Sequence, residues 1–181
     1  MVAGLERLSE ESRYRRFMAP IARFTDAQLR YLTEVDHVDH EALIALAMAE
    51  PDQPGIGVAR YVRLLDRPDT AEAAVTVIDD YHGRGLGTIL LALLGTAALS
   101  HGVRRFRAYV LEENRPMRQV LESLGAEAHH DSPGVLRMET PLPSSPEVIP
   151  DTPAGRVLKA VALGTVPGVV VDRRLRELGE G

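Results

Sequence analysis

Three glycines at every second position separate a short apolar run from a long one in the segment VIDDYHGRGLGTILLALL, residues 77–94. The pattern predicts a strand, a tight turn and a helix. Such a turn presents bare backbone N–H groups at a helix N-terminus, where hydrogen bonds and the helix dipole bind a pyrophosphate. Gly85 and Gly87 let a ligand approach the backbone closely, and Thr88 can add a hydroxyl. The segment therefore predicts a phosphate-bearing ligand.

Two other phosphate-binding motifs do not fit this segment. A Walker A loop requires a lysine after its last glycine, and the segment contains none. The dinucleotide fingerprint requires G-x-G-x-x-G, whereas Gly83, Gly85 and Gly87 are spaced by two. What remains is a strand–turn–helix that holds its ligand mainly through backbone donors.

Composition narrows the class of protein. The 181 residues are enough for one domain with a core, and a net charge of −5 argues against a general nucleic-acid binder. There is no cysteine, so disulfides and thiolate metal sites are excluded. The N-terminal residues lack the apolar core of a signal peptide, and no apolar run reaches the roughly 18 residues of a membrane span. We therefore expect a cytoplasmic protein that binds neither nucleic acid nor membrane.

Local patterns predict the elements that position the turn. Ser9 can cap a first helix, and Thr25 with Gln28 forms a capping box for a second. The run HEALIALAMAE (40–50) fits a helix or a strand. Further elements are expected as strands at 55–65, 71–79, 103–111 and 134–142 and helices at 85–100 and 115–125, with turns at 66–70 and around 129–131.

This order of elements predicts a mixed α/β or α+β sheet within one domain, residues 1–140. Residues 141–153 hold five prolines and are expected to form a linker or an extended wrap. Residues 154–181 would be a C-terminal extension that packs on the domain or on a partner.

The motif YHGRGLGT (81–88) resembles the acyl-CoA-binding motif of the GNAT N-acetyltransferases, with His82, Gly85 and Gly87 at the motif positions. The segment VLEENRPMRQVLESLGA (110–126) looks like the second CoA-side segment of that superfamily. The pieces SRYRRF, VDHVDHEALIALA and GVARY look most like the bacterial Pat-type protein lysine acetyltransferases. The resemblance covers residues 8–140.

The resemblance implies a GNAT fold, in which a mixed sheet flanked by helices is splayed between its fourth and fifth strands. The arm of acetyl-CoA would lie in that gap, one backbone N–H would polarise the thioester, and no metal would be needed. His37 and His40 are accordingly expected in a polar loop. For Asn114, a plain helix cap is an alternative to a CoA contact, and both can hold at once. The cofactor-binding residues implied are Val75, Thr76, Val77, His82, Gly83, Arg84, Gly85, Leu86, Gly87, Thr88 and Asn114.

Glu72 is the residue expected to accept the proton of the attacking amine, because it lies among small and apolar residues on the strand before the turn. The alternative is a solvent-facing carboxylate on an alternating strand. A tyrosine that many family members use as the general acid is replaced here by Leu121. Tyr61 and Tyr109 are candidates by residue type only, and a CoA thiolate can also leave without help.

The acceptor is expected to be a protein lysine, for example on an acyl-CoA synthetase. A predicted acidic patch of Asp36, Asp39, Glu41 and Glu72 would attract it, but would equally attract an aminoglycoside or a polyamine. A further alternative is a degenerate module that binds acyl-CoA without turnover. A monomer and a homodimer are both compatible with the sequence.

The resemblance begins inside the first helix of the family, so the family's first strand is expected to be missing. The segment TVPGVVVDRRL (165–175) has strand composition and is expected to fill the vacant edge, in the same chain or in a partner.

Overall fold

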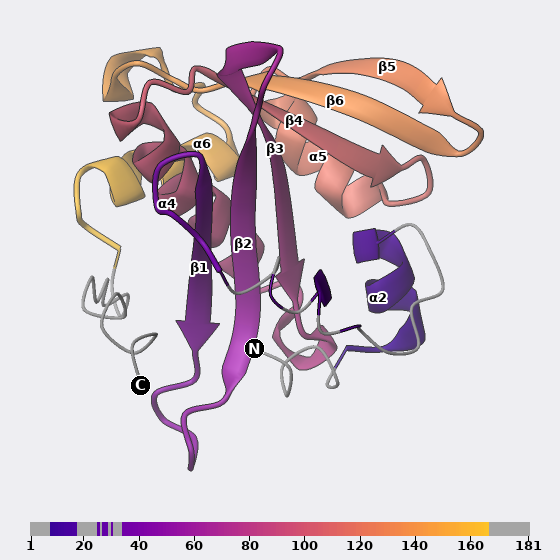
Figure 1. Cartoon of the computed structure of the whole chain (residues 1–181). Helices are drawn as coiled ribbons and strands as arrows, with labels where there is room; N and C mark the ends of the chain where they lie inside the picture. The colour runs from indigo at the N-terminus through magenta and orange to yellow at the C-terminus, as the bar shows by residue number, and fades with distance from the viewer. Residues whose placement is uncertain (1–7, 18–24, 26, 29, 31–33, 167–181) are drawn as a thin grey trace.

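The computed structural model describes residues 8–17, 25, 27–28, 30 and 34–166 (Figure 1). Most of the segment expected to fill the vacant edge, residues 167–175, lies outside this part. So does much of the second expected helix, but its capping box is present. The backbone N–H of Thr25 donates to Oε1 of Gln28 at 2.9 Å, and the N–H of Gln28 donates to Oγ1 of Thr25 at 3.2 Å.

The described residues form a six-stranded sheet in the order β1-β2-β3-β4-β6-β5 (Figure 1). The β3–β4 pair is parallel, and the other neighbours are antiparallel. The fold is therefore the expected mixed α/β architecture. The strands are β1 (His40–Leu46), β2 (Gly55–Leu64), β3 (Arg67–Val77), β4 (Arg105–Leu111), β5 (Glu127–Ser132) and β6 (Val135–Pro141).

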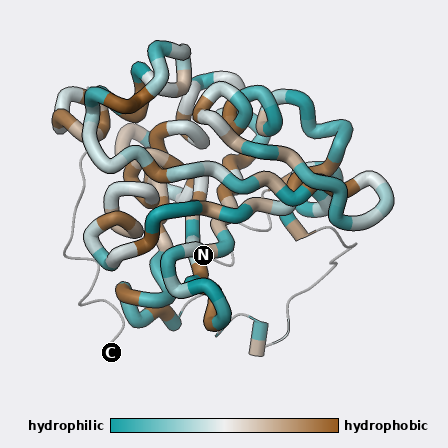
Figure 2. Tube along the Cα trace, turned by 90° about the horizontal axis from the view of Figure 1, so that it is seen from above, coloured by the Kyte–Doolittle hydropathy of each residue, from teal (hydrophilic) through white to brown (hydrophobic). Residues whose placement is uncertain are grey.

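One face of the sheet packs against α4 (Leu86–Ser100) and α5 (Arg115–Ser123). Leu94 of α4 is fully buried there against Tyr61 and Ala71. Figure 2 shows how hydrophobic and hydrophilic residues alternate along the helices and strands. Because side chains alternate between the two faces of a strand, the residues between these core positions point to the opposite face.

The opposite face is contacted at one end by α2 (Glu10–Phe17). Ser9 caps this helix as expected, with its Oγ accepting from the N–H of Ser12 at 3.1 Å. Asp79, in the short 3-10 turn Asp79–Tyr81 that comes before the glycines, accepts the N–H of Ser9 at 3.1 Å and the hydroxyls of Ser9 and Ser12, both at 2.9 Å. One carboxylate therefore fastens the start of α2 to the start of the turn.

Three local expectations are settled or corrected. The ambiguous run at 40–50 is a strand over residues 40–46, β1, which pairs in register with β2. The turn expected at 66–70 is shorter, since β3 already begins at Arg67. Residues 127–132 were expected to include a surface turn and instead form β5, whose residues are all exposed and which is held by pairing with β6.

The proline-rich segment continues from β6 across the helical layer to a short 3-10 turn, Pro146–Val148, and to α6 (Pro153–Ala162), which packs on α4 (Figure 1). Thr152 caps α6 by accepting from the N–H of Gly155 at 3.0 Å. An added Cβ on Gly155 would lie 1.9 Å from the carbonyl oxygen of Pro150, so only glycine allows this close contact. None of the helices in the described ranges has the length and apolar character needed to cross a membrane.

Candidate functional site

The parallel strands β3 and β4 separate along their length. They pair only at Thr70 with Arg105, Ala71 with Phe106 and Glu72 with Arg107. Beyond this point β3 continues to Val77 and β4 to Leu111 without pairing to each other. The sheet is therefore splayed between the strand that precedes the glycine turn, β3, and the next strand, β4, as expected. This leaves a gap between the two strand edges (Figure 1).

The backbone of β3 directs hydrogen-bonding groups into this gap at alternate residues. The N–H of Ile78 donates to the carbonyl oxygen of Ile56 at 3.0 Å, so this pair is hydrogen-bonded across β2 and β3. Hydrogen-bonded and non-hydrogen-bonded pairs alternate along an antiparallel ladder. Val77 and Val75 therefore turn their N–H and C=O groups away from β2 and toward the gap, where an amide-bearing ligand can pair with them. The backbone groups of Thr76 are used by β2.

The glycine turn lies at the open end of the gap. Gly83 and Gly85 have φ angles of 70° and 78°, in the left-handed region that side-chain-bearing residues avoid. Gly85 is the N-cap of α4 and provides no side-chain cap. The first N–H groups of α4, at Leu86, Gly87 and Thr88, precede its first internal hydrogen bond, from Ile89 to Gly85 at 3.0 Å. They form the N-terminus of a 15-residue helix, which favours an anion.

Two side chains beside the gap have features that a ligand can use. His82 donates from Nε2 to the carbonyl oxygen of Val77 at 2.8 Å, so this ring covers one of the gap-facing acceptors. Oγ1 of Thr76 is buried and has no hydrogen-bond partner among the described residues. An orphaned hydroxyl beside the gap fits a ligand that brings polar groups, since buried polar groups are normally paired.

The other predicted residues are placed as follows. The guanidinium of Arg84 lies over the ring of Tyr81, 4.7 Å from its centroid. Leu86 packs into the apolar core. Asn114 is the N-cap of α5, with Oδ1 accepting from the N–H of Met117 at 3.4 Å, and it also lines the cavity described below. Its amide group is not needed for the cap, so the cap and a ligand contact are compatible.

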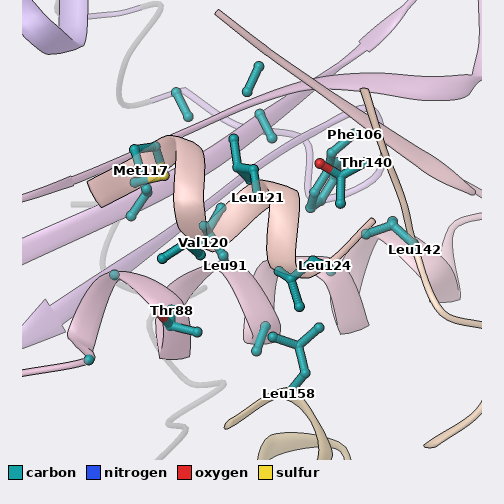
Figure 3. Close-up of a pocket in the computed structure, with 18 of the residues that line it drawn as sticks. Thr88, Leu91, Phe106, Met117, Val120, Leu121, Leu124, Thr140, Leu142 and Leu158 are labelled. Carbon is teal, nitrogen blue, oxygen red and sulfur yellow. The ribbon is translucent and has the colours of Figure 1, made fainter. Parts of the chain in front are cut away.

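A cavity of about 1130 Å³ joins these features. It runs from the glycine turn between α4 and α5 toward the proline-rich segment and α6. Figure 3 shows Leu91 of α4 and Leu121 of α5 facing this space, with Thr88 toward one end and Leu158 toward another. The predicted cofactor residues line it, with the exception of Arg84. Their assignment as ligands of the arm stays a prediction.

Glu72 lies at the closed end of the gap and is exposed. It points to the face opposite α4, because its neighbours Ala71 and Ala73 belong to the core beneath. The position is that of a solvent-facing residue on an alternating strand, rather than of a carboxylate enclosed by apolar groups. Its role as the base stays a prediction.

The prediction that Asp36, Asp39, Glu41 and Glu72 form one acidic patch is wrong. Asp36 uses Oδ1 to accept three backbone N–H groups of its own loop, and these hold the pKa of Asp36 below its ordinary value. Asp39 pairs with Arg63. Glu41 is buried on the α4 face with His37, 2.8 Å away. Glu72 is on the other face, so strand alternation separates it from Glu41.

The face around Glu72 carries arginines instead. Arg67 and Arg107 both donate to Glu139, with the shortest contacts at 3.1 and 3.0 Å, and Arg137 lies 4.0 Å from the same carboxylate. Burial alone would raise the pKa of Glu139, but the hydrogen bonds from Arg67 and Arg107 hold it below its usual value. Three arginines therefore gather around one carboxylate on the face that carries Glu72. The arginines of β3, β4 and β6 were the feature of the sequence that could have indicated this cluster.

The structure separates the two tyrosines considered for the general acid. Tyr61 is fully buried on the α4 face and donates to the carbonyl oxygen of Val38 at 2.8 Å. Burial, with the negative charge of Glu41, raises the pKa of Tyr61 to about 12. Tyr109 of β4 lines the cavity, as does Leu121. Tyr61 is therefore excluded, and Tyr109 remains.

A sheet that opens between two parallel strands, with a glycine turn and a helix N-terminus at the head of the gap, is the arrangement expected of an acyl-CoA-dependent acyltransferase. The comparisons give the family. Residues 3–127 match the model of the acetyltransferase (GNAT) domain. The chain belongs to the GNAT family of acetyl-CoA-dependent N-acetyltransferases.

Relatives and solved structures agree with this assignment. The chain is 40% identical to the acetyltransferase Pat of Mycolicibacterium smegmatis over 140 residues, which are 77% of this chain and 41% of that protein. It is 31% identical over 127 residues to an acetyltransferase of Pseudomonas aeruginosa, covering 70% and 68% of the two chains. The GNAT domain of S. lividans PAT superposes with a TM-score of 0.69 at 33% identity, over 78% of this chain and 82% of that one.

A cAMP-binding acyltransferase from Mycobacterium smegmatis superposes with a TM-score of 0.54 at 34% identity, over 84% of this chain and 48% of that one. The chain thus spans less than half the length of these two mycobacterial relatives. Among the described residues, no group of three or more His, Cys, Asp or Glu side chains is arranged to hold a metal ion.

Proposed function

We propose that this chain transfers an acetyl group from acetyl-CoA directly to a primary amine, the side chain of a lysine in another protein. The observation that carries the proposal is the gap itself. Val75 and Val77 turn backbone groups into it, and the unpaired N-terminus of α4 stands at its head. The amides of an extended pantetheine arm match the first feature, and a pyrophosphate matches the second.

In this arrangement each part of the site has one task. The N–H groups of the turn and of Leu86, Gly87 and Thr88 hold the pyrophosphate. A backbone N–H at Val75 or Val77 donates to the thioester carbonyl oxygen and stabilises the negative charge that develops there. Asn114 holds the arm through its amide group. Glu72, at the closed end of the gap, accepts a proton from the amine before it attacks.

The surroundings of Glu72 favour a protein-borne lysine over a small polycation. Glu72 is exposed on a sheet face, which a large acceptor can reach. The arginines that share Glu139 would repel an aminoglycoside or a polyamine, since like charges disfavour association. A lysine with acidic neighbours would be attracted. The alternative of binding without turnover is decided by the activity measurement below. A cytoplasmic location and the choice between monomer and homodimer stay predictions.

The first experiment is calorimetric titration with acetyl-CoA, with desulfo-CoA as the comparison ligand, followed by turnover with lysine peptides, acceptor proteins and spermidine. We expect Glu72→Gln to lower kcat by about 10²–10⁴-fold and to leave the Kd of acetyl-CoA unchanged. Glu127→Gln is the matched control, because this exposed carboxylate lies on the same sheet at the far strand β5. Full activity of Glu72→Gln would refute its role as base. Micromolar binding with no acceptor acetylated would support the binding module instead.

A further inference from the structure

The cavity continues past the place where an acetyl group would end. The pyrophosphate site is at Leu86, and the nine residues from there to Gly95 advance about 14 Å along the helix axis. On the facing wall, β3 advances about 13 Å from Val77 to Ala73. An arm that spans this distance from the turn ends near Gly95 and Ala73. The cavity reaches further, to Leu99 of α4 and Leu158 of α6.

This far part is lined almost entirely by apolar groups. Phe106, Leu142, Ile149 and Leu158 line it together with prolines of the segment after β6. Its lining contains no charged residue among those described, since the two charged side chains on the cavity wall are Arg15 and Arg16 of α2. Figure 3 shows Phe106, Leu142 and Leu158 around this end of the space. Such a lining fits a hydrocarbon and does not fit a charged acceptor.

Gly95 lies where the two parts of the cavity meet. It is buried in the middle of α4, although glycine is unfavourable inside a helix. A Cβ at this position would stand 3.4 Å from Cδ2 of Leu142 and 3.9 Å from Cε2 of Phe106, both residues of the cavity wall. The bare backbone of Gly95 therefore lets α4 pack closely against Leu142 and Phe106, and a side chain longer than a Cβ would extend into the cavity that these residues line.

We propose that the far part is an acyl-chain pocket, and that this chain accepts acyl-CoA thioesters with saturated acyl groups longer than acetyl. The proposal rests on the proposed function and names its donor class. The proline-rich segment and α6 close the pocket, which gives these C-terminal elements a role in donor selection. The reaction is unchanged in kind: the amine nitrogen bonds to the acyl carbon, the C–S bond breaks, and the sulfur leaves as a thiolate. Glu72 takes one amine proton, and the thiolate takes up a proton, so the products are an amide and free CoA.

The test compares binding of acetyl-, butyryl-, hexanoyl- and octanoyl-CoA to the full chain by calorimetry. Each buried methylene is expected to tighten binding by up to about fourfold until the pocket is full. We expect Gly95→Leu to abolish this gain per methylene, measured as the Kd of each longer thioester relative to the Kd of acetyl-CoA for the same variant. Ser100→Leu, which adds the same side chain at an exposed position of α4 outside the cavity, is the control.

The outcomes separate this inference from the proposed function. If acetyl-CoA binds but the longer thioesters bind no more tightly to the wild-type chain, the acyl-chain pocket is refuted and the proposed function stands. If no CoA ester binds, the proposed function is refuted, and the acyl-chain pocket, which rests on it, is refuted as well. The wild-type series needs no variant, so the inference stays testable even if Gly95→Leu does not fold. Chain-length gains that are equal in Gly95→Leu and Ser100→Leu would also overturn it.

Discussion

Glu72 on β3 and Arg107 on β4 are the last residues that pair the two parallel strands. Beyond them the strand edges separate, and the backbone groups of Val75 and Val77 have no partner strand on that side. The end of the pairing therefore fixes two things at once. It defines how deep a ligand arm can enter the gap, and it places a carboxylate at that depth.

The first prediction concerns the turn. Gly85→Ala should weaken acetyl-CoA binding by at least about tenfold, because an L-residue at a φ of 78° strains the N-cap and shifts the phosphate-binding N–H groups. Gly134→Ala is the matched control, since Gly134 has a φ of 76° in the β5–β6 hairpin and also has nothing within 4 Å of an added Cβ. Both variants should lose about 1–2 kcal/mol of stability in thermal unfolding. Equal Kd values for the two would contradict the phosphate site.

The second prediction concerns the ion pairs of Glu139 with Arg67 and Arg107 at the closed end of the gap, here called the clamp. Glu139→Gln should lower the free energy of unfolding by about 1–2 kcal/mol, because Arg67 and Arg107 lose a charged acceptor. The pKa of Glu139 is held below its ordinary value of 4.5, so its contribution is present above that pH and is lost as the pH falls through the lowered pKa. Denaturant unfolding between pH 7 and pH 3 measures this. A wild-type pH dependence retained in full by Glu139→Gln would argue against the clamp.

The third prediction concerns the attachment of α2. Asp79→Ala should raise amide hydrogen exchange in residues 10–17, because Ser9 and Ser12 lose their common acceptor. Although burial works to raise it, hydrogen bonds from Ser9 and Ser12 keep the pKa of Asp79 below 3.8. In the wild-type chain the attachment should persist above that pH and weaken as the pH falls further. Asp80→Ala changes the exposed neighbouring residue and should leave both the hydrogen exchange of residues 10–17 and its pH dependence unchanged. An equal effect of Asp79→Ala and Asp80→Ala would contradict the role of Asp79 in attaching α2.

The fourth prediction separates the tyrosines. Tyr61→Phe should lower the free energy of unfolding by about 1–3 kcal/mol, because the carbonyl oxygen of Val38 loses its buried donor, and should leave kcat unchanged. Tyr109→Phe should lower kcat by about tenfold or more, since Tyr109 lines the cavity and would protonate the leaving thiolate. The pH dependence of kcat for both variants is the measurement. An unchanged rate in Tyr109→Phe would mean that the thiolate leaves without help.

Local features were predictable because their causes are local. The caps of α2 and α5 at Ser9 and Asn114 follow from short polar side chains before helical runs. The hairpin of β2 and β3 follows from two adjacent apolar runs, although its turn is shorter than expected. Strand β5 was missed because all its residues are exposed, so it carries no hydrophobic alternation and depends on pairing with β6.

The sequence by itself determined the glycine turn before α4, since left-handed glycines and a helix N-terminus need only neighbouring residues. Only the tertiary structure decided which charges meet. Glu41 and Glu72, two of the carboxylates expected to form an acidic patch, lie on opposite faces of the sheet, and arginines from three strands gather around Glu139 instead. It also decided that the proline-rich segment lines the cavity. Strand register and the packing of distant segments depend on contacts far apart in the chain, which no local pattern specifies.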